Sequence, residues 1–172
     1  MAGDALWYEA AQVVGITNAL NVVADGLGGV MAPVKVTGAS PEVAAVFDEI
    51  RSFYGGTPDI PGPFALAAHD PAYLADLWAA ARHAYDDNCL ARRLKAALAF
   101  AVSLTTRSAF GTGFHLAEMR RLGVGERGVT EIVGVTQMFS SYTKIADTLQ
   151  LEPDMGDIAP VDPTPAPGAG AG

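Results

Sequence analysis

Cysteine is almost absent from this sequence: 172 residues contain one, Cys89. A single cysteine excludes a disulfide within the chain and any metal site built from several cysteines. Cys89 stands in "DDNCLARR" at a predicted helix start, where the helix dipole and the nearby Arg92 and Arg93 would favour a thiolate. Because no second cysteine can resolve an oxidised product, we expect Cys89 to be an inert or partly buried structural residue.

Charged residues are also scarce, and their balance is acidic. They make up 17% of the chain, against 50% hydrophobic residues, and the formal net charge is -8. Such a chain is not expected to bind nucleic acid or an anionic membrane. No cationic leader opens the sequence, and charges interrupt each apolar run before it reaches the length of a membrane span. We therefore expect a globular cytoplasmic protein.

Metal and cofactor motifs are missing as well. His69 and His83 have no carboxylate pair at ligand spacing, so a metal site is not expected. The glycine-containing stretches lack the strand–turn–helix context of a phosphate-binding loop. The sequence therefore predicts a protein without a cofactor.

Alternating strand patterns are absent too, and helical spacing takes their place, so the sequence predicts an all-α chain. The predicted helices span 4–27, 41–54, 71–86, 90–105, 107–121 and 126–150, with a short helical turn at 64–68. Ser40 followed by Pro41 is a typical helix start. From Pro153 the chain consists largely of Pro, Gly, Ala and Asp. We predict a helical domain over 1–152 and a mobile tail over 153–172.

An internal repeat relates the first and the last long helix. Residues 9–28 align without gaps on residues 131–150. Identical residues occur at Glu9/Glu131, Val13/Val135, Ala24/Ala146, Asp25/Asp147 and Leu27/Leu149. Both segments end on the pattern "AD-x-L" in the same register. The chain therefore consists, on this interpretation, of the last helix of one repeat followed by one complete repeat.

The stretch that begins "VSLTTRSAFGTGFHLAEMRRLGV" and runs to Leu151 resembles the carboxymuconolactone decarboxylase and AhpD-like alkylhydroperoxidase superfamily. The segment "PEVAAVFDEI…AARHA" before it is similar to the corresponding segment of the peroxidase-related branch. The resemblance covers roughly residues 5–151 and implies an AhpD-like helical bundle. Members of the family form trimers or hexamers. We therefore expect a homotrimer or a trimer-based hexamer, or a hetero-oligomer in which a related chain supplies the missing half-repeat.

The functional motif of the thiol branch is incomplete here. That motif is a glutamate, then Cys-x-x-Cys, then a histidine four residues later, and it forms a proton relay that produces a reactive thiolate. The alignment puts Ala96 at the glutamate, Ser108 and Gly111 at the cysteines, and His115 at the histidine. A serine hydroxyl is far less acidic than a thiol, and glycine has no side chain. The resemblance therefore implies that peroxidase and disulfide-reductase activity is absent.

The remaining histidine, His115, has two interpretations. Non-thiol branches of the family keep a histidine near the position of His115. The resemblance implies that this histidine helps to transfer a proton at a carbon next to a carbonyl, without a cofactor. On that interpretation the catalytic candidates are His115, Glu118 and Ser108, and the substrate-binding candidates are Arg107, Phe110, Phe114 and Tyr142. Arg92 is a further candidate for binding a substrate carboxylate. On the other interpretation His115 is a core residue, hydrogen-bonded to Ser108 or to a backbone carbonyl.

Three hypotheses of function remain open. The leading one is a catalytically altered family member that serves as a structural or assembly subunit, because the thiol motif is lost while the helical pattern is intact. The second is a cofactor-free decarboxylase or isomerase that acts on a small carboxylate or lactone through His115. The third is a protein that binds a small ligand in the vacated pocket.

Overall fold

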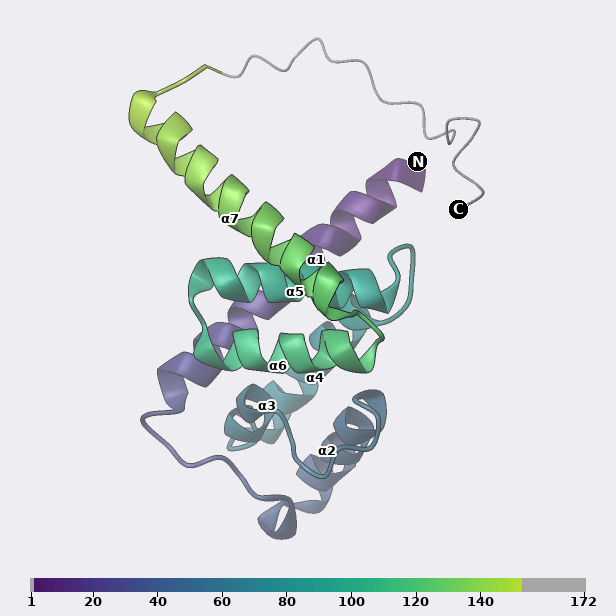
Figure 1. The fold of residues 1–172 in the computed structure, drawn as a ribbon. Helices are drawn as coiled ribbons and strands as arrows, with labels where there is room; N and C mark the ends of the chain where they lie inside the picture. Colours follow the sequence, from purple (N-terminus) through teal and green to yellow (C-terminus); the bar gives the residue numbers. More distant parts are fainter. Residues whose placement is uncertain (1, 153–172) are drawn as a thin grey trace, which may run out of the picture.

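Seven α-helices make up the described part of the chain, residues 2–152 of the computed structural model (Figure 1). They are α1 Ala2–Leu27, α2 Pro41–Phe53, α3 Gly62–Ala67, α4 Pro71–Tyr85, α5 Arg92–Thr106, α6 Ala109–Arg121 and α7 Glu126–Leu149. Residues 2–152 contain no strand, which confirms the all-α prediction. A 3-10 turn, η1 Val36–Gly38, was not predicted. The tail predicted over 153–172 lies outside the described residues.

Side-chain caps explain where several helices begin. The Ser40 hydroxyl accepts a hydrogen bond from the backbone N–H of Val43 at 3.4 Å, and the Asp70 carboxylate accepts one from Tyr73 at 3.1 Å. A proline follows each cap, at a position where its missing N–H costs nothing. Helices α2 and α4 therefore begin where the sequence predicted.

Two helices begin two residues later than predicted. Helix α5 starts at Arg92, and α6 starts at Ala109. The backbone of Arg107 is left-handed, with φ of 58°, which ends α5. The next residue, Ser108, caps α6 because its hydroxyl accepts a hydrogen bond from the Gly111 N–H at 3.0 Å. The sequence analysis missed this cap because it placed Ser108 inside a helix.

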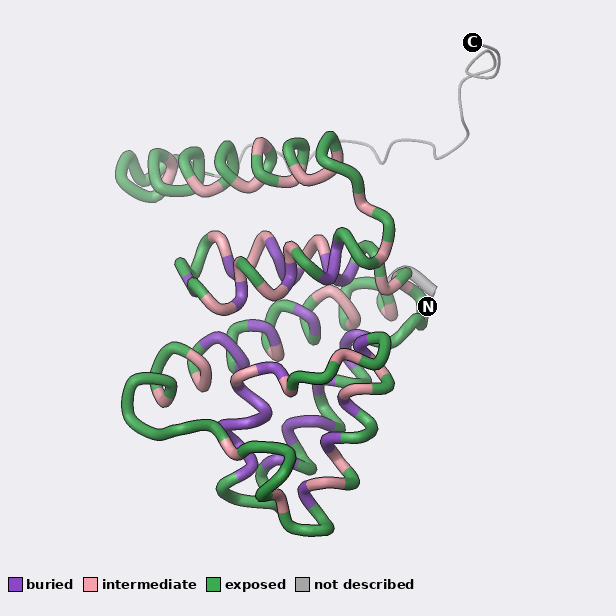
Figure 2. Tube along the Cα trace, turned by 60° about the horizontal axis from the view of Figure 1, so that its bottom comes forward, coloured by how far each residue is buried: buried purple, intermediate pink, exposed green. Residues whose placement is uncertain are grey.

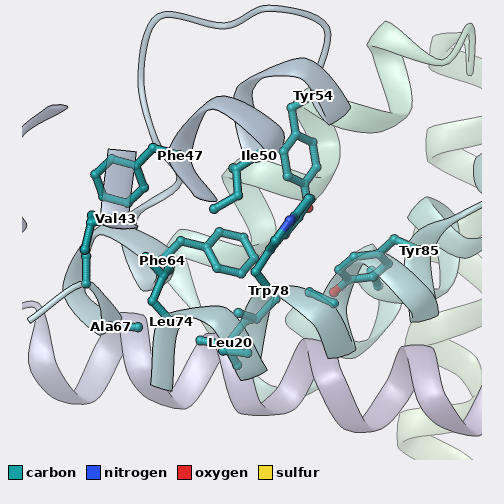
Figure 3. Packing of buried hydrophobic residues seen from close by; sticks show 14 of the residues in the cluster. Leu20, Val43, Phe47, Ile50, Tyr54, Phe64, Ala67, Leu74, Trp78 and Tyr85 are labelled. Carbon is teal, nitrogen blue, oxygen red and sulfur yellow. The ribbon is translucent and has the colours of Figure 1, made fainter. Parts of the chain in front are cut away.

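The main hydrophobic core lies among the first four helices and α5. Figure 3 shows Phe64 and Tyr54 pointing toward Trp78, and the Phe64 and Trp78 rings meet edge to face at 5.6 Å. Helix α1 contributes Val13 and Leu20, which are at most 2% exposed. It packs against α3, α4, α5 and α6 and so runs through the centre of the fold. Helix α1, the helix that the repeat relates to α7, is therefore part of the chain's own core.

Helix α7 is much less buried than α1. Its first half packs through Val129 and Ile132 on a small second cluster formed by Ala96, Phe100 and Met119. No residue of α7 is itself buried. Figure 1 shows its C-terminal half projecting away from the other helices, and Figure 2 shows it as an outer layer. The two helices related by the repeat therefore have very different surroundings.

Within residues 2–152, none of the helices combines the length and the hydropathy that crossing a membrane requires.

Candidate functional site

A small cavity lies at the meeting point of α2, α4, α5 and α6. Its lining consists of Phe53, Tyr54, Tyr85, Arg92, Ala96, His115 and Glu118. The cavity volume is about 10 Å³, counted as the space that the centre of a water molecule can reach. This is about the space that one water molecule requires. The cavity therefore holds several polar groups but no room for an organic substrate as it stands.

His115 is almost completely buried at this cavity, with 3% of its surface exposed. The Phe114 and Tyr85 rings lie 5.1 and 5.9 Å from the imidazole, centre to centre. Its Nε2 atom has no hydrogen-bond partner, so this atom makes neither the expected bond to Ser108 nor one to a carbonyl. Burial lowers the pKa of His115 to about 4, although the negative charge of Glu118 opposes the shift. The imidazole is therefore neutral near pH 7 and carries a free nitrogen.

Two tyrosines lie at the same cavity. The hydroxyl of Tyr54 is buried and has no hydrogen-bond partner, and burial raises its pKa well above the usual range. The hydroxyl of Tyr85 is 2.7 Å from the hydroxyl of Thr17 on α1, and burial likewise raises its pKa. The sequence analysis named neither tyrosine, since each stands at a helix end far from the family motif. Among the described residues that line this cavity, Tyr54 and His115 are the two with a fully buried side-chain polar atom that has no hydrogen-bond partner.

Glu118 lines the same cavity as His115, and two guanidinium groups hold its carboxylate. Arg92 donates to Oε1 at 2.8 Å, and Arg121 donates to both oxygens at 2.6 and 2.7 Å. Arg92 also donates to the Phe53 carbonyl at 2.8 Å and lies 3.6 Å from the centre of the Phe53 ring. Paired charges of this kind fix one another in place. In this arrangement both oxygens of Glu118 accept hydrogen bonds from guanidinium groups, and Arg92 is already held by Glu118 and the Phe53 carbonyl.

The positions that align with the two cysteines are both inside the fold. Ser108 is 1% exposed, and its hydroxyl caps α6. A β-carbon built at Gly111 would overlap the Asn21 side-chain amide, with Cγ at 2.9 Å, and the Ser103 hydroxyl. Asn21 comes from α1 and donates hydrogen bonds to Ser103 at 3.1 Å and to Thr106 at 3.2 Å. Helix α1 therefore fills the space beside Gly111 through Asn21, a role that the sequence analysis missed.

The predicted substrate-binding residues are only partly brought together. Phe114 packs on His115, and Phe110 stacks on Phe114 with ring centres 5.4 Å apart. Neither phenylalanine lines the cavity. They pack beside the His115 ring outside the cavity. Arg107 is exposed where α5 ends, and Tyr142 is 58% exposed on α7. The structure does not bring Arg107 or Tyr142 to the cavity.

The prediction that Cys89 stands at a helix start is wrong. Cys89 is exposed in the turn after α4, and α5 begins three residues later. The carboxylate of Glu9 accepts hydrogen bonds from the N–H groups of Cys89 and Leu90, both at 2.8 Å, and lies 3.2 Å from the Lys95 ammonium. These contacts lower the pKa of Glu9 to about 2, and the same carboxylate raises the pKa of the Cys89 thiol. The surroundings therefore disfavour a thiolate.

Among the residues that the structure describes, no three or more His, Cys, Asp or Glu side chains cluster in a way that could hold a metal ion.

Comparison with known proteins gives a fold. No protein-family model matches the chain, and no curated protein matches its sequence. The crystal structure of an alkylhydroperoxidase AhpD core from Rhodospirillum rubrum is similar, with a TM-score of 0.64 and 23% sequence identity. The similarity covers 72% of this chain and 95% of the other. The predicted fold is confirmed: the chain has the helical fold of the AhpD core.

Proposed function

We propose that this protein is an AhpD-fold protein without thiol chemistry, and that it serves as a structural subunit of an oligomer. The observation that carries the proposal is the uncovered apolar face of α7. The exposed large hydrophobic residues of α7 are Val133, Val135, Met138, Phe139, Tyr142, Ile145 and Leu149. All of them except Val133 lie on this face. A helix with such a face is stable in water when another apolar surface covers it.

Two features of the site support the absence of thiol chemistry. The lone cysteine is exposed, its thiolate is disfavoured by Glu9, and no second cysteine exists to resolve a sulfenic acid. At Gly111, the space beside the backbone is occupied by Asn21. A thiol at that position would require the Asn21 and Ser103 side chains to shift.

The assembly that we propose is a homotrimer or a trimer-based hexamer, as the family resemblance implies. The alternative is a hetero-oligomer in which a related chain supplies the missing half-repeat. The acidic charge is consistent with an oligomer that binds neither nucleic acid nor membrane, and we propose a cytoplasmic location.

Two measurements on the full-length protein test the proposal. Light scattering after size-exclusion chromatography should give the mass of an oligomer at micromolar concentration, and a stable monomer would overturn the assembly role. A coupled assay should show no reduction of alkyl hydroperoxide or disulfide. Turnover that is lost in Cys89→Ser would overturn our interpretation of that cysteine as inert.

A second candidate function is acid–base catalysis through His115. It is supported by Nε2 of His115 and the hydroxyl of Tyr54, which are both buried, unpartnered and at one cavity. A neutral imidazole can accept a proton and a phenol can donate one, which suits cofactor-free decarboxylation or isomerisation of a small carboxylate or lactone. The cavity would have to open, because it now has room for about one water. The same limit applies to a small-ligand binding role.

The test of this candidate is a pair of variants, His115→Ala and Tyr54→Phe, assayed on small carboxylates and lactones. Catalysis at the cavity predicts activity in the unsubstituted protein that His115→Ala abolishes and Tyr54→Phe reduces. Absence of activity on every such substrate, or activity that survives His115→Ala, would exclude it.

A further inference from the structure

We propose that α7 pairs antiparallel with α7 of a second copy of this chain, about a two-fold axis at the middle of the helix. This inference rests on the assembly role proposed above and names the surface that performs it. The surface has two parts, a ridge on the C-terminal half of α7 and a groove between α5 and the N-terminal half of α7.

The ridge consists of Met138, Tyr142, Ile145 and Leu149, and it continues from Val135. Successive members are separated by three and four residues in alternation, which is the spacing of helices that pair along their length. Each of these side chains is between 49% and 63% exposed. The charged residues Lys144 and Asp147 lie about 200° around the helix from Tyr142 and Ile145, respectively, and so leave the ridge apolar.

The internal repeat allows the apolar face of α7 to be compared with the equivalent face of α1, which is buried. In the alignment of 131–150 on 9–28, the five residues from Val135 to Leu149 correspond to Val13, Ile16, Leu20, Val23 and Leu27 of α1. Val13 and Leu20 are 0% and 2% exposed in the core of their own chain. Because α1 already occupies that place against α5 and α6, α7 has no equivalent place in the same chain. Its apolar face therefore requires a surface from another copy.

The groove is carried by the same helix. Its lining consists of Leu94, Ala97, Leu98 and Ala101 of α5 with Gly128, Glu131, Ile132, Val135 and Thr136 of α7, and its volume is about 410 Å³. Leu94 is 49% exposed there. One half of α7 thus borders a groove and the other half carries a ridge. A two-fold axis between the halves places each ridge in the groove of the other copy, which is the self-complementarity of a two-fold interface.

The heptad positions fix the register of the pair. Antiparallel packing of the two seams puts Val135 opposite Met138, Glu131 opposite Tyr142, and Gly128 opposite Ile145. The small residue Gly128 thereby faces a large one. The Glu131 carboxylate, whose side chain is 64% exposed, faces a phenol that can donate a hydrogen bond to it.

The area is adequate for a specific interface. A helix of 24 residues is roughly 36 Å long, and a strip that includes the neighbouring face of α5 is about 20 Å wide. The footprint is therefore roughly 700 Å² per copy, close to the roughly 800 Å² of a standard interface. Two-fold pairs occur in a dimer or in a hexamer of three pairs, whereas a plain cyclic trimer contains no two-fold axis.

The first test uses charge on the ridge. Ile145→Glu in the full-length protein should at least halve the mass measured by light scattering, because it places a carboxylate in an apolar seam. The fold of the single chain should stay intact, because Ile145 is half exposed there, so helical content and a cooperative thermal transition should be retained. The midpoint of that transition should fall only by the contribution of the lost assembly. Lys144→Glu, in the same turn but about 130° around the helix from the middle of the ridge, is the matched control and should keep the mass of the unsubstituted protein.

The second test uses the register. Glu131→Cys/Tyr142→Cys in a Cys89→Ser background should form a covalent dimer on mild oxidation. Within one chain the two positions are about 16 Å apart along the helix, too far for a disulfide, so the bond must join two copies. The matched control Glu131→Cys/Lys144→Cys should cross-link far less. Equal cross-linking in both pairs, or none in the first, would overturn the interface.

The outcomes separate this inference from the assembly role on which it rests. A monomeric unsubstituted protein would overturn both. An oligomer that survives Ile145→Glu and does not cross-link through residues 131 and 142, or a cyclic trimer, would overturn the α7 pair alone. Removing residues 153–172 should leave the cross-link intact. Loss of the cross-link in that truncation would point to the tail and would overturn the proposal.

Discussion

A buried histidine with a free nitrogen makes the stability of the fold depend on pH. The pKa of His115 is about 4 in the folded chain, against an ordinary value of 6.5. Between these values the unfolded chain binds a proton that the folded chain does not, so acidification favours unfolding. The contribution of His115 is fully present above about pH 6.5 and is lost as pH falls toward 4.

We predict a decrease in the free energy of unfolding of at most about 3 kcal/mol from this residue between pH 7 and pH 4. His115→Leu should remove that part of the decrease, because leucine does not titrate. The measurement is urea denaturation of both proteins at the two pH values, at a fixed protein concentration. An equal pH dependence in the two proteins would contradict the lowered pKa.

A second prediction at the residue scale concerns Gly111, which the family resemblance aligns with the second cysteine of the thiol motif. Gly111→Cys should lower the free energy of unfolding by about 1–3 kcal/mol, because its β-carbon would overlap the Asn21 amide and the Ser103 hydroxyl. In an Asn21→Ala background the same substitution should be less destabilising, because the side-chain amide that the new β-carbon would overlap most has been removed. A double-mutant cycle measures this coupling, and additive effects would show that Asn21 does not close the position.

At the scale of single elements, the repeat provides a matched pair of positions. Leu20 on α1 and Tyr142 on α7 occupy the same register, yet Leu20 is 2% exposed and Tyr142 is 58% exposed. Leu20→Ala should lower the free energy of unfolding by about 2–5 kcal/mol, as for other buried leucines. Tyr142→Ala should change it by no more than about 0.5 kcal/mol.

These two effects are best compared in the Ile145→Glu background, where assembly through α7 does not contribute to stability. Denaturant unfolding of the two variants then reports the folding of the single chain. A large loss in Tyr142→Ala under these conditions would mean that α7 packs more closely on its own chain than the structure shows.

At the scale of the whole molecule, the two ends of the chain should behave differently. Deleting residues 1–28 removes Val13 and Leu20 from the core and Asn21 from beside Gly111. We predict that this protein loses its cooperative thermal transition, so that it fails to fold rather than merely failing to assemble. Deleting residues 153–172 should leave both the transition and the oligomer mass unchanged. Circular dichroism and light scattering check both expectations, and a folded product of the first deletion would contradict the central place of α1.

The sequence alone determined the helices, because their causes are local. Apolar residues three and four positions apart, the cap at Ser40 and the glycines after the first two helices are all contained within single segments. The sequence also contains one cysteine, and the family resemblance aligns Ser108 and Gly111 with the two cysteines of the thiol motif. The place of His115 on its helix followed from the family resemblance, and the structure buries the imidazole beside Phe114.

Only the tertiary structure decided what each helix face touches. The same pattern of apolar residues is buried in α1 and exposed in α7, because burial depends on which surface lies opposite and not on the helix itself. The contacts of Glu9 with Cys89, of Arg92 with Glu118, and of Asn21 with Ser103 join residues 26 to 82 positions apart. Sequence spacing predicts contacts within one helix or strand, and it does not predict contacts between residues so far apart in the chain. Their consequences arise from packing: a disfavoured thiolate, a carboxylate held by guanidinium groups, and a filled space beside Gly111.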